Sequence, residues 1–107
     1  MTKKYEDIKM MSATEAAEIS EANIKNYVPD ILEKISKRIS DSANRGIRNI
    51  IFSYEKNCEK YVMEKCAKDV IDYLLEKGYV LNRFNDGKTV HIIDTYGGFT
   101  LSLNITW

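Results

Sequence analysis

The stretch Phe99–Trp107, FTLSLNITW, decides the fold because it alternates apolar and polar side chains without interruption. A period of two places one set of side chains on a core and the other set in water, which is typical of a half-buried β-strand. Gly97 and Gly98 precede this run, and a second alternating run, Thr89–Thr95, precedes the two glycines. The C-terminal third of the chain is therefore predicted to be an antiparallel meander that ends in its outer strand.

The N-terminal half carries helical patterns instead. Ser12 to Glu15 forms a capping box, in which the serine hydroxyl accepts a hydrogen bond from the glutamate amide and the glutamate reaches back. Pro29 has no amide proton and suits the first turn of a helix, so it is predicted to open a second helix over residues 29–45. Gly46 then stands where a left-handed residue would end that helix.

Between these helices and the meander, the pattern predicts a strand, a helix and another strand. The strands are expected over residues 47–54 and 79–84, and the helix over residues 58–77. Asp86-Gly87 is predicted to be a two-residue hairpin turn. The buried face of the helix is expected to consist of Val62, Met63, Cys66, Ala67, Val70, Tyr73 and Leu74.

Together these elements predict an α+β fold: N-terminal helices, then β-α-β-β-β, with a mixed or antiparallel four-stranded sheet covered by helices on one face. If the strands at 47–54 and 79–84 are neighbours, their helical connection makes them a parallel pair. Residues 1–11 are expected to be a polar N-terminal extension, and residues 12–107 a single domain.

Composition excludes several classes of function. The chain of 107 residues has 16 basic and 16 acidic side chains, so it lacks the basic footprint of most nucleic-acid-binding proteins. No apolar run reaches the roughly 20 residues of a membrane span, and the N-terminus lacks the apolar segment of a signal peptide. A cytoplasmic protein without a membrane partner is predicted.

No pattern of catalytic, cofactor-binding or metal-binding residues is present, so the chain is predicted not to be an enzyme and to need no cofactor. His91 is the only histidine and is interpreted as a surface or structural residue. Cys66 is expected in the core, and it lies eight residues from Cys58, about 12 Å along a helix, which is too far for a disulfide. Cys58 lies near a helix N-terminus, where the helix dipole would lower its pKa.

Four segments resemble small uncharacterised accessory or virion-associated proteins of tailed bacteriophages. They are MSATEAAEIS at 11–20, ILEKISKRISDSANRGIRNIIFSY at 31–54, VIDYLLEKGYVL at 70–81 and the ending ITW at 105–107. The resemblance implies a phage-encoded protein that works in the host cytoplasm. It supplies no active-site residues, but it implies that a host-directed inhibitor of antiviral defence, acting as an effector blocker or a nucleotide-signal sponge, is an alternative.

The leading hypothesis is a non-enzymatic binding or assembly protein that forms a homo-oligomer and can engage a host or phage protein. Tyrosine is enriched at interfaces, and a strand with neither charge nor proline is a poor free edge. A nucleic-acid-binding module is a further alternative, which the balanced charge disfavours. The predicted interface consists of Tyr96, Phe99, Thr100, Ser102 and Trp107.

Overall fold

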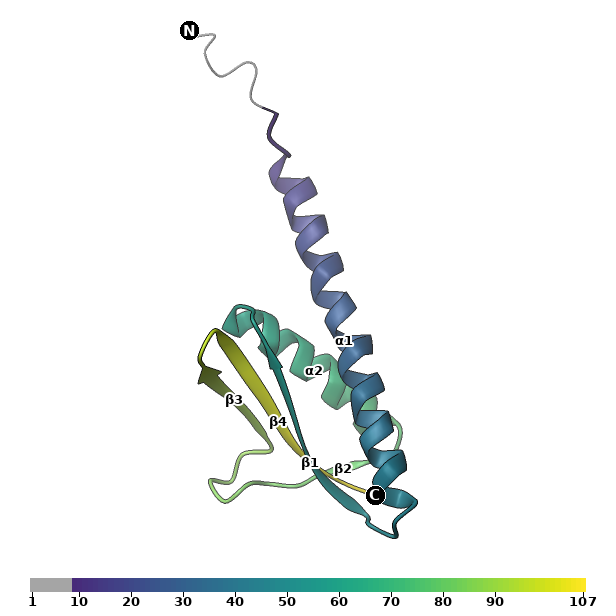
Figure 1. Cartoon of the computed structure of the whole chain (residues 1–107). Coiled ribbons are helices and arrows are strands. Elements are labelled where there is room, and N and C mark those ends of the chain that lie inside the picture. Colours follow the sequence, from purple (N-terminus) through teal and green to yellow (C-terminus); the bar gives the residue numbers. More distant parts are fainter. Residues whose placement is uncertain (1–8) are drawn as a thin grey trace, which may run out of the picture.

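The computed structural model describes residues 9–107, so most of the predicted polar extension, residues 1–8, lies outside the described residues. Met10 and Met11, at its end, are exposed. Six elements follow (Figure 1). In chain order they are α1 (Ala13–Ala43), β1 (Asn49–Lys56), α2 (Lys60–Glu76), β2 (Val80–Leu81), β3 (Val90–Thr95) and β4 (Gly98–Thr106).

All strand pairings involve β4 and all are antiparallel. One edge of β4 pairs with β1 over its whole length, and the other edge pairs first with β3 and then with β2. Both helices pack on the same side of this sheet, which leaves the opposite face uncovered (Figure 1). The predicted α+β class, with a four-stranded sheet covered on one face, is confirmed, and the sheet is antiparallel rather than mixed.

The core lies between the sheet and the two helices. Leu101, Leu103 and Ile105 of β4 are fully buried, as the alternation predicts, while the residues between them face the other way. All the positions predicted for the buried face of α2 are buried except Tyr73, which is 45% exposed. The other buried residues are Ile24, Ile31, Ile35, Ile50, Phe52 and Tyr54.

The prediction that β4 is an outer strand is wrong, and so is the predicted hairpin between β2 and β3. The turn at Asp86-Gly87 does form, with the Gly87 amide donating to the Phe84 carbonyl over 2.9 Å. However, β2 contains two residues and β3 six, and the nine residues of β4 accommodate both of them end to end on one edge. Strands that occupy the same edge in succession cannot pair with each other. The parallel pair is also absent, because β4 separates β1 from β2.

Pro29 does not open a second helix, so the prediction of a separate helix over residues 29–45 is wrong. It lies inside α1, which continues for 31 residues from the Ser12 cap to Ala43. A proline inside a helix costs about 3 kcal/mol, since it removes one hydrogen bond and crowds the preceding turn. Ile24 and Ile31 are buried on either side of it. Burial of each is worth about 1.5–3 kcal/mol, so a continuous helix that keeps both in the core is favoured.

Replacement of Pro29 by alanine is expected to raise the free energy of unfolding by about 1–3 kcal/mol, because it restores the missing hydrogen bond. Urea denaturation followed by circular dichroism measures the change. Asn26→Ala is the matched control, since it alters helix propensity at a nearby exposed position and is expected to add less than about 0.7 kcal/mol. A gain no larger than that of the control would contradict a helix that runs through residue 29.

Two glycines are required for different reasons. Gly46 has φ +78°, and a Cβ atom at this position would meet no other atom within 4 Å, so only its backbone conformation excludes other residues. Gly98, at the start of β4, has an ordinary φ, but a Cβ there would collide with the carbonyl oxygen of Lys56 and lie 2.8 Å from Cα of Asn57. Absence of a side chain at Gly98 therefore lets the end of β1 approach β4 closely.

Gly98→Ala is expected to destabilise the protein more than Gly46→Ala. The first substitution forces two strands apart, whereas the second imposes the left-handed strain of about 1–2 kcal/mol on one exposed residue. Thermal denaturation of both variants ranks them. The reverse order would contradict the close contact between β1 and β4.

Candidate functional site

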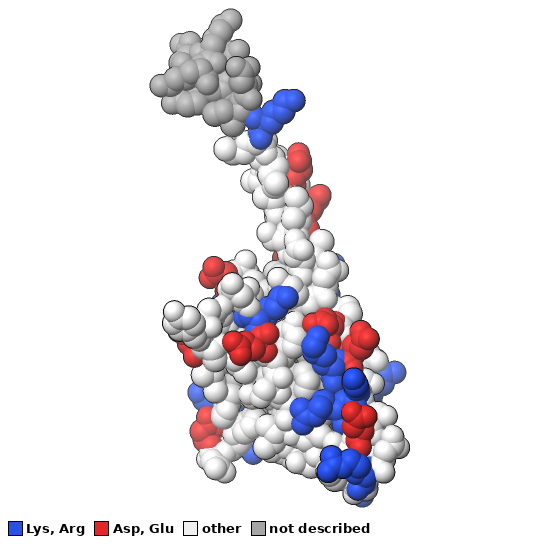
Figure 2. Space-filling model, viewed as in Figure 1, with Lys and Arg blue, Asp and Glu red and all other residues white. Residues whose placement is uncertain are grey.

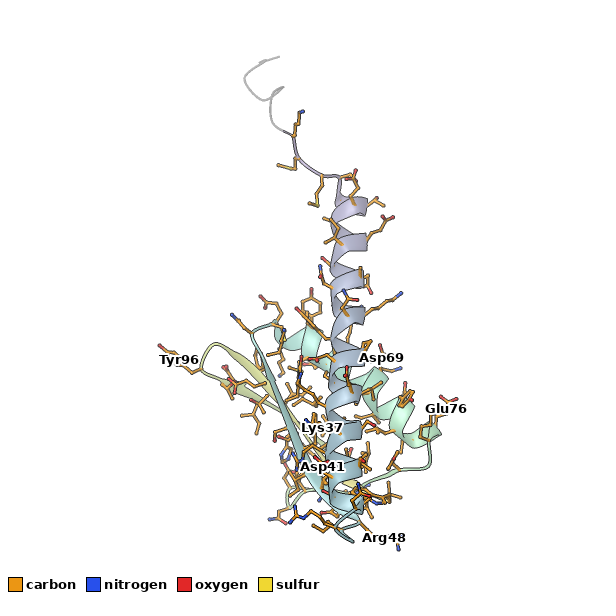
Figure 3. All side chains as sticks on the ribbon, turned by 45° about the vertical axis from the view of Figure 1, so that its right-hand side comes forward. Lys37, Asp41, Arg48, Asp69, Glu76 and Tyr96 are labelled. Atoms are coloured by element: carbon orange, nitrogen blue, oxygen red, sulfur yellow. The ribbon has the colours of Figure 1, made fainter. Side chains whose placement is uncertain are left out.

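The five residues of the predicted interface do not form one surface. Tyr96 is fully exposed at the tip of the turn between β3 and β4 (Figure 3), while Phe99 is half-buried and turned toward the core. Trp107 follows β4 at its other end, where its ring meets that of Tyr79 edge-on with 6.4 Å between centroids. Thr100 and Ser102 alone share a face of the sheet.

That face is the uncovered side of the sheet, which we call the open face. The strand register defines its members as Asn49, Ile51, Ser53, Glu55, Val80, His91, Ile93, Thr95, Thr100, Ser102, Asn104 and Thr106. Three aliphatic side chains, Ile51, Val80 and Ile93, are more than half exposed on it. Glu55 is its only Asp, Glu, Lys or Arg, and Figure 2 shows a largely uncharged area over the strands.

His91 lies at one corner of the open face. Its ring stacks on Phe84 with 4.1 Å between centroids, and its Nε2 atom lies 2.8 Å from a carboxylate oxygen of Asp86. The Lys88 amide and His91 both hydrogen-bond to Asp86, which lowers the pKa of this carboxyl group. These contacts fix the 84–88 turn against β3, which is the structural role that the sequence predicts for the histidine.

Neither cysteine has the properties of a nucleophile. Cys66 is buried, its thiol donates to the Ile24 carbonyl over 3.6 Å, and burial raises its pKa to about 11. Burial also raises the pKa of Cys58, and the nearby Glu59 acts in the same direction. The predicted lowering of the Cys58 pKa is wrong, because α2 begins only at Lys60 and desolvation outweighs other influences on the thiol.

Both thiols are therefore expected to react slowly with Ellman's reagent at pH 8, with Cys66 slower than Cys58. A raised pKa keeps each sulfur in the unreactive thiol form, and Cys66 is also shielded. In the Cys58→Ser variant the reaction rate is that of Cys66 alone. The same chain unfolded in denaturant gives the reaction rate of thiols that the fold does not shield. Reaction of native Cys58 faster than that of the denatured chain would indicate an activated thiol.

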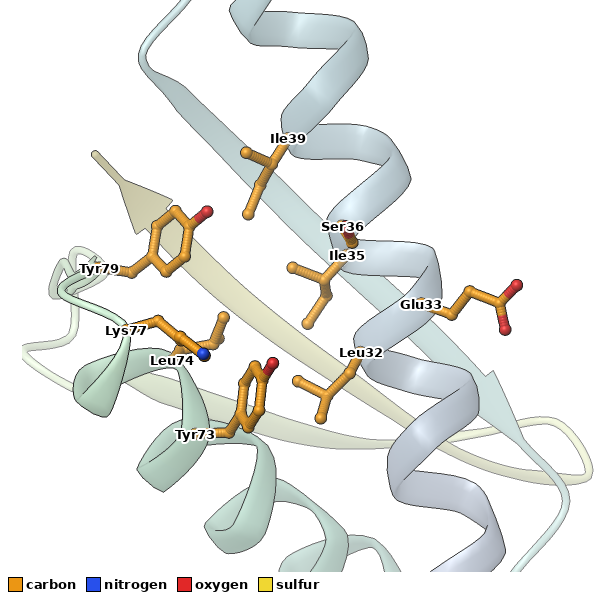
Figure 4. Close-up of a pocket in the computed structure, with 9 residues that line it drawn as sticks. All are labelled: Leu32, Glu33, Ile35, Ser36, Ile39, Tyr73, Leu74, Lys77 and Tyr79. Carbon is orange, nitrogen blue, oxygen red and sulfur yellow. The ribbon is translucent and has the colours of Figure 1, made fainter.

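A second surface feature is a groove of about 430 Å³ between α1 and the end of α2 (Figure 4). Gly78, with φ +92°, ends α2, and the Tyr79 amide then donates to the Leu74 carbonyl over 3.0 Å. This C-terminal motif typically brings the residue after the glycine back onto the last helical turn. It places Tyr79 opposite Tyr73, so that the two rings flank the mouth of the groove (Figure 4).

The groove combines an apolar floor with polar groups on one rim. Leu32, Ile35, Ile39 and Leu74 form the floor. On the rim the ammonium of Lys77 lies near the hydroxyl of Tyr73, while the hydroxyl of Tyr79 points away from them, toward Ile39 (Figure 4). This site was not predicted from the sequence, although the Leu74-to-Tyr79 spacing around Gly78 is a signal that could have indicated part of it.

Within residues 9–107, no group of three or more His, Cys, Asp or Glu side chains is arranged to hold a metal ion. No helix in this same part of the chain is long and apolar enough to cross a lipid bilayer. No family model, curated protein or solved structure matches the sequence or the fold.

Proposed function

We propose that this chain is a non-enzymatic binding and assembly protein that self-associates through the open face of its sheet. The observation that carries the proposal is the combination of Ile51, Val80 and Ile93, each more than half exposed. Among the strand positions of this face Glu55 alone is charged, and the carboxylate of Asp86 lies beside its His91 corner. Charged residues make up 30% of the chain, so this face is depleted of them. Interface centres are depleted of charge in the same way.

A second copy of the same chain is the partner that this surface suits. A two-fold axis brings identical patches together, so a strongly charged face would repel its own copy, whereas this one would not. Serine, threonine and asparagine side chains can exchange hydrogen bonds across the contact. The Ser53 and Ser102 hydroxyls, which lie 3.1 Å apart at the centre of the face, are placed to do so.

The size of the face supports a weak rather than a tight dimer. Nine residues of β4 span about 30 Å, and the width of three strands is about 14 Å, which gives a projected area of about 400 Å². Stable complexes bury about 800 Å² on each partner. We therefore expect a reversible dimer with a dissociation constant in the micromolar range.

The two edges of the sheet are less suited to this contact. At the free edge of β1, the Ile51 carbonyl already accepts a hydrogen bond of 3.3 Å from the guanidinium of Arg38. The free edge of β3 carries the exposed carboxylate of Asp94. Charged groups placed on edge strands discourage strand addition. Self-association through the face agrees with both observations.

The phage origin implied by the resemblance would make this protein an accessory or virion-associated component. Inhibition of a host defence protein is the alternative, and it would use the same uncharged face against a different partner. Salt dependence separates both functions from nucleic-acid binding. The affinity of a protein for nucleic acid falls steeply as the salt concentration rises, whereas the affinity of a contact through an uncharged face does not.

Thr100→Lys combined with Ser102→Lys is expected to convert a concentration-dependent dimer into a monomer. Both positions lie on the open face of the central strand, so two added charges per chain repel their symmetry mates while the core is unchanged. Sedimentation equilibrium up to about 500 μM measures the association. Thermal denaturation establishes that the variant is folded.

Asn26→Lys combined with Ser40→Lys is the matched control, because it adds the same charge to exposed positions of α1. It is expected to dimerise like the unsubstituted chain. An unsubstituted chain that stays monomeric throughout the concentration range would overturn the proposal. Equal dimerisation of the sheet variant would place the contact elsewhere on the molecule.

A further inference from the structure

We infer that the groove between α1 and α2 binds a small amphipathic anion, with an apolar body on its floor and a carboxylate at its rim. This inference is independent of self-association, because the groove lies on the helical side of the sheet (Figure 4). Its volume of about 430 Å³ falls within the range of small-molecule sites, which are typically apolar with a few converging polar groups.

The floor determines the apolar part of the ligand. Leu32, Ile39 and the buried Ile35 project from α1, and Leu74 projects from α2, with no charged atom between them (Figure 4). An alkyl chain or a ring laid along this floor would cover apolar surface that is otherwise in contact with water. Each methylene group removed from water contributes about 0.8 kcal/mol to binding.

The rim determines the charge of the ligand. The ammonium of Lys77 lies 5.5 Å from the centroid of the Tyr73 ring, between the two tyrosine side chains. The Tyr73 hydroxyl and the ammonium can donate hydrogen bonds, and a carboxylate accepts them. The one acidic residue of the lining, Glu33, directs its carboxylate away from the groove (Figure 4).

The C-terminal end of α2 repels an anion less than a helix end with unpaired carbonyl oxygens would. The carbonyls of Tyr73, Leu74 and Leu75 each accept a backbone hydrogen bond, from the amides of Lys77, Tyr79 and Gly78 respectively. These acceptors are therefore satisfied within the chain and are not left to face the ligand. Lys77 is then the dominant charge at this end of the groove.

Titration with sodium octanoate, followed by ¹⁵N-edited NMR, tests the inference. Octanoate is expected to bind in the millimolar range or tighter, and to shift amide resonances of both α1 and α2 around the groove. Octylammonium has the same alkyl chain with a cationic head and is expected to bind at least threefold more weakly. Shifts confined to other surfaces, or equal binding of the two probes, would overturn the inference.

Lys77→Gln is expected to weaken octanoate binding about three- to fivefold, as fits a partly exposed ion pair, and to leave binding of neutral 1-octanol unchanged. Lys37→Gln removes a lysine from the outer face of α1 (Figure 3) and is expected to change neither. Leu32→Trp, which fills the groove, is expected to abolish binding of both probes. If Lys77→Gln binds octanoate as tightly as the unsubstituted chain does, the assigned role of the rim is wrong.

Discussion

The structure depends on the burial of one strand. Leu101, Leu103 and Ile105 of β4 have no exposed surface, and every other strand pairs with β4. Their burial, at about 1.5–3 kcal/mol for each side chain, fixes which face of β4 points to the helices. A shift of register by one residue would turn all three to water, so this burial also fixes the register of β1, β2 and β3.

The packing of α1 follows from that core, and it is uneven along the helix. Ile24 is the first buried residue of α1. The part of the helix that precedes it, toward the N-terminus, extends away from the sheet and α2 (Figure 1). Glu21 still reaches Lys65 of α2 over 3.2 Å. Toward its C-terminal half, Asp30 accepts hydrogen bonds from Lys34 and Tyr54, which lower the pKa of the carboxyl group. The second half of the helix is therefore the anchored part.

The two surfaces with functional potential arise from the same arrangement. Because both helices pack on one side of the sheet, the other side remains uncovered and becomes the open face. Because α1 and α2 are in contact at Ile24 and Cys66 and diverge toward their C-terminal ends, they leave the groove between them. One surface is broad and nearly uncharged, and the other is small and carries a positive rim at Lys77. They differ in size and in chemistry.

Local patterns in the sequence determined much of this protein. The alternation in Phe99–Trp107, the Ser12 cap and the stops at Gly46 and Gly78 depend on neighbours within a few residues, and the structure has all of them. Tertiary packing decided the rest. The central place of β4 depends on how two short strands share one edge, and the continuity of α1 through Pro29 depends on the burial of Ile24 and Ile31. The groove likewise joins Leu32 to Tyr79, which lie far apart in the chain, and only the packing energy of the whole core determines such contacts.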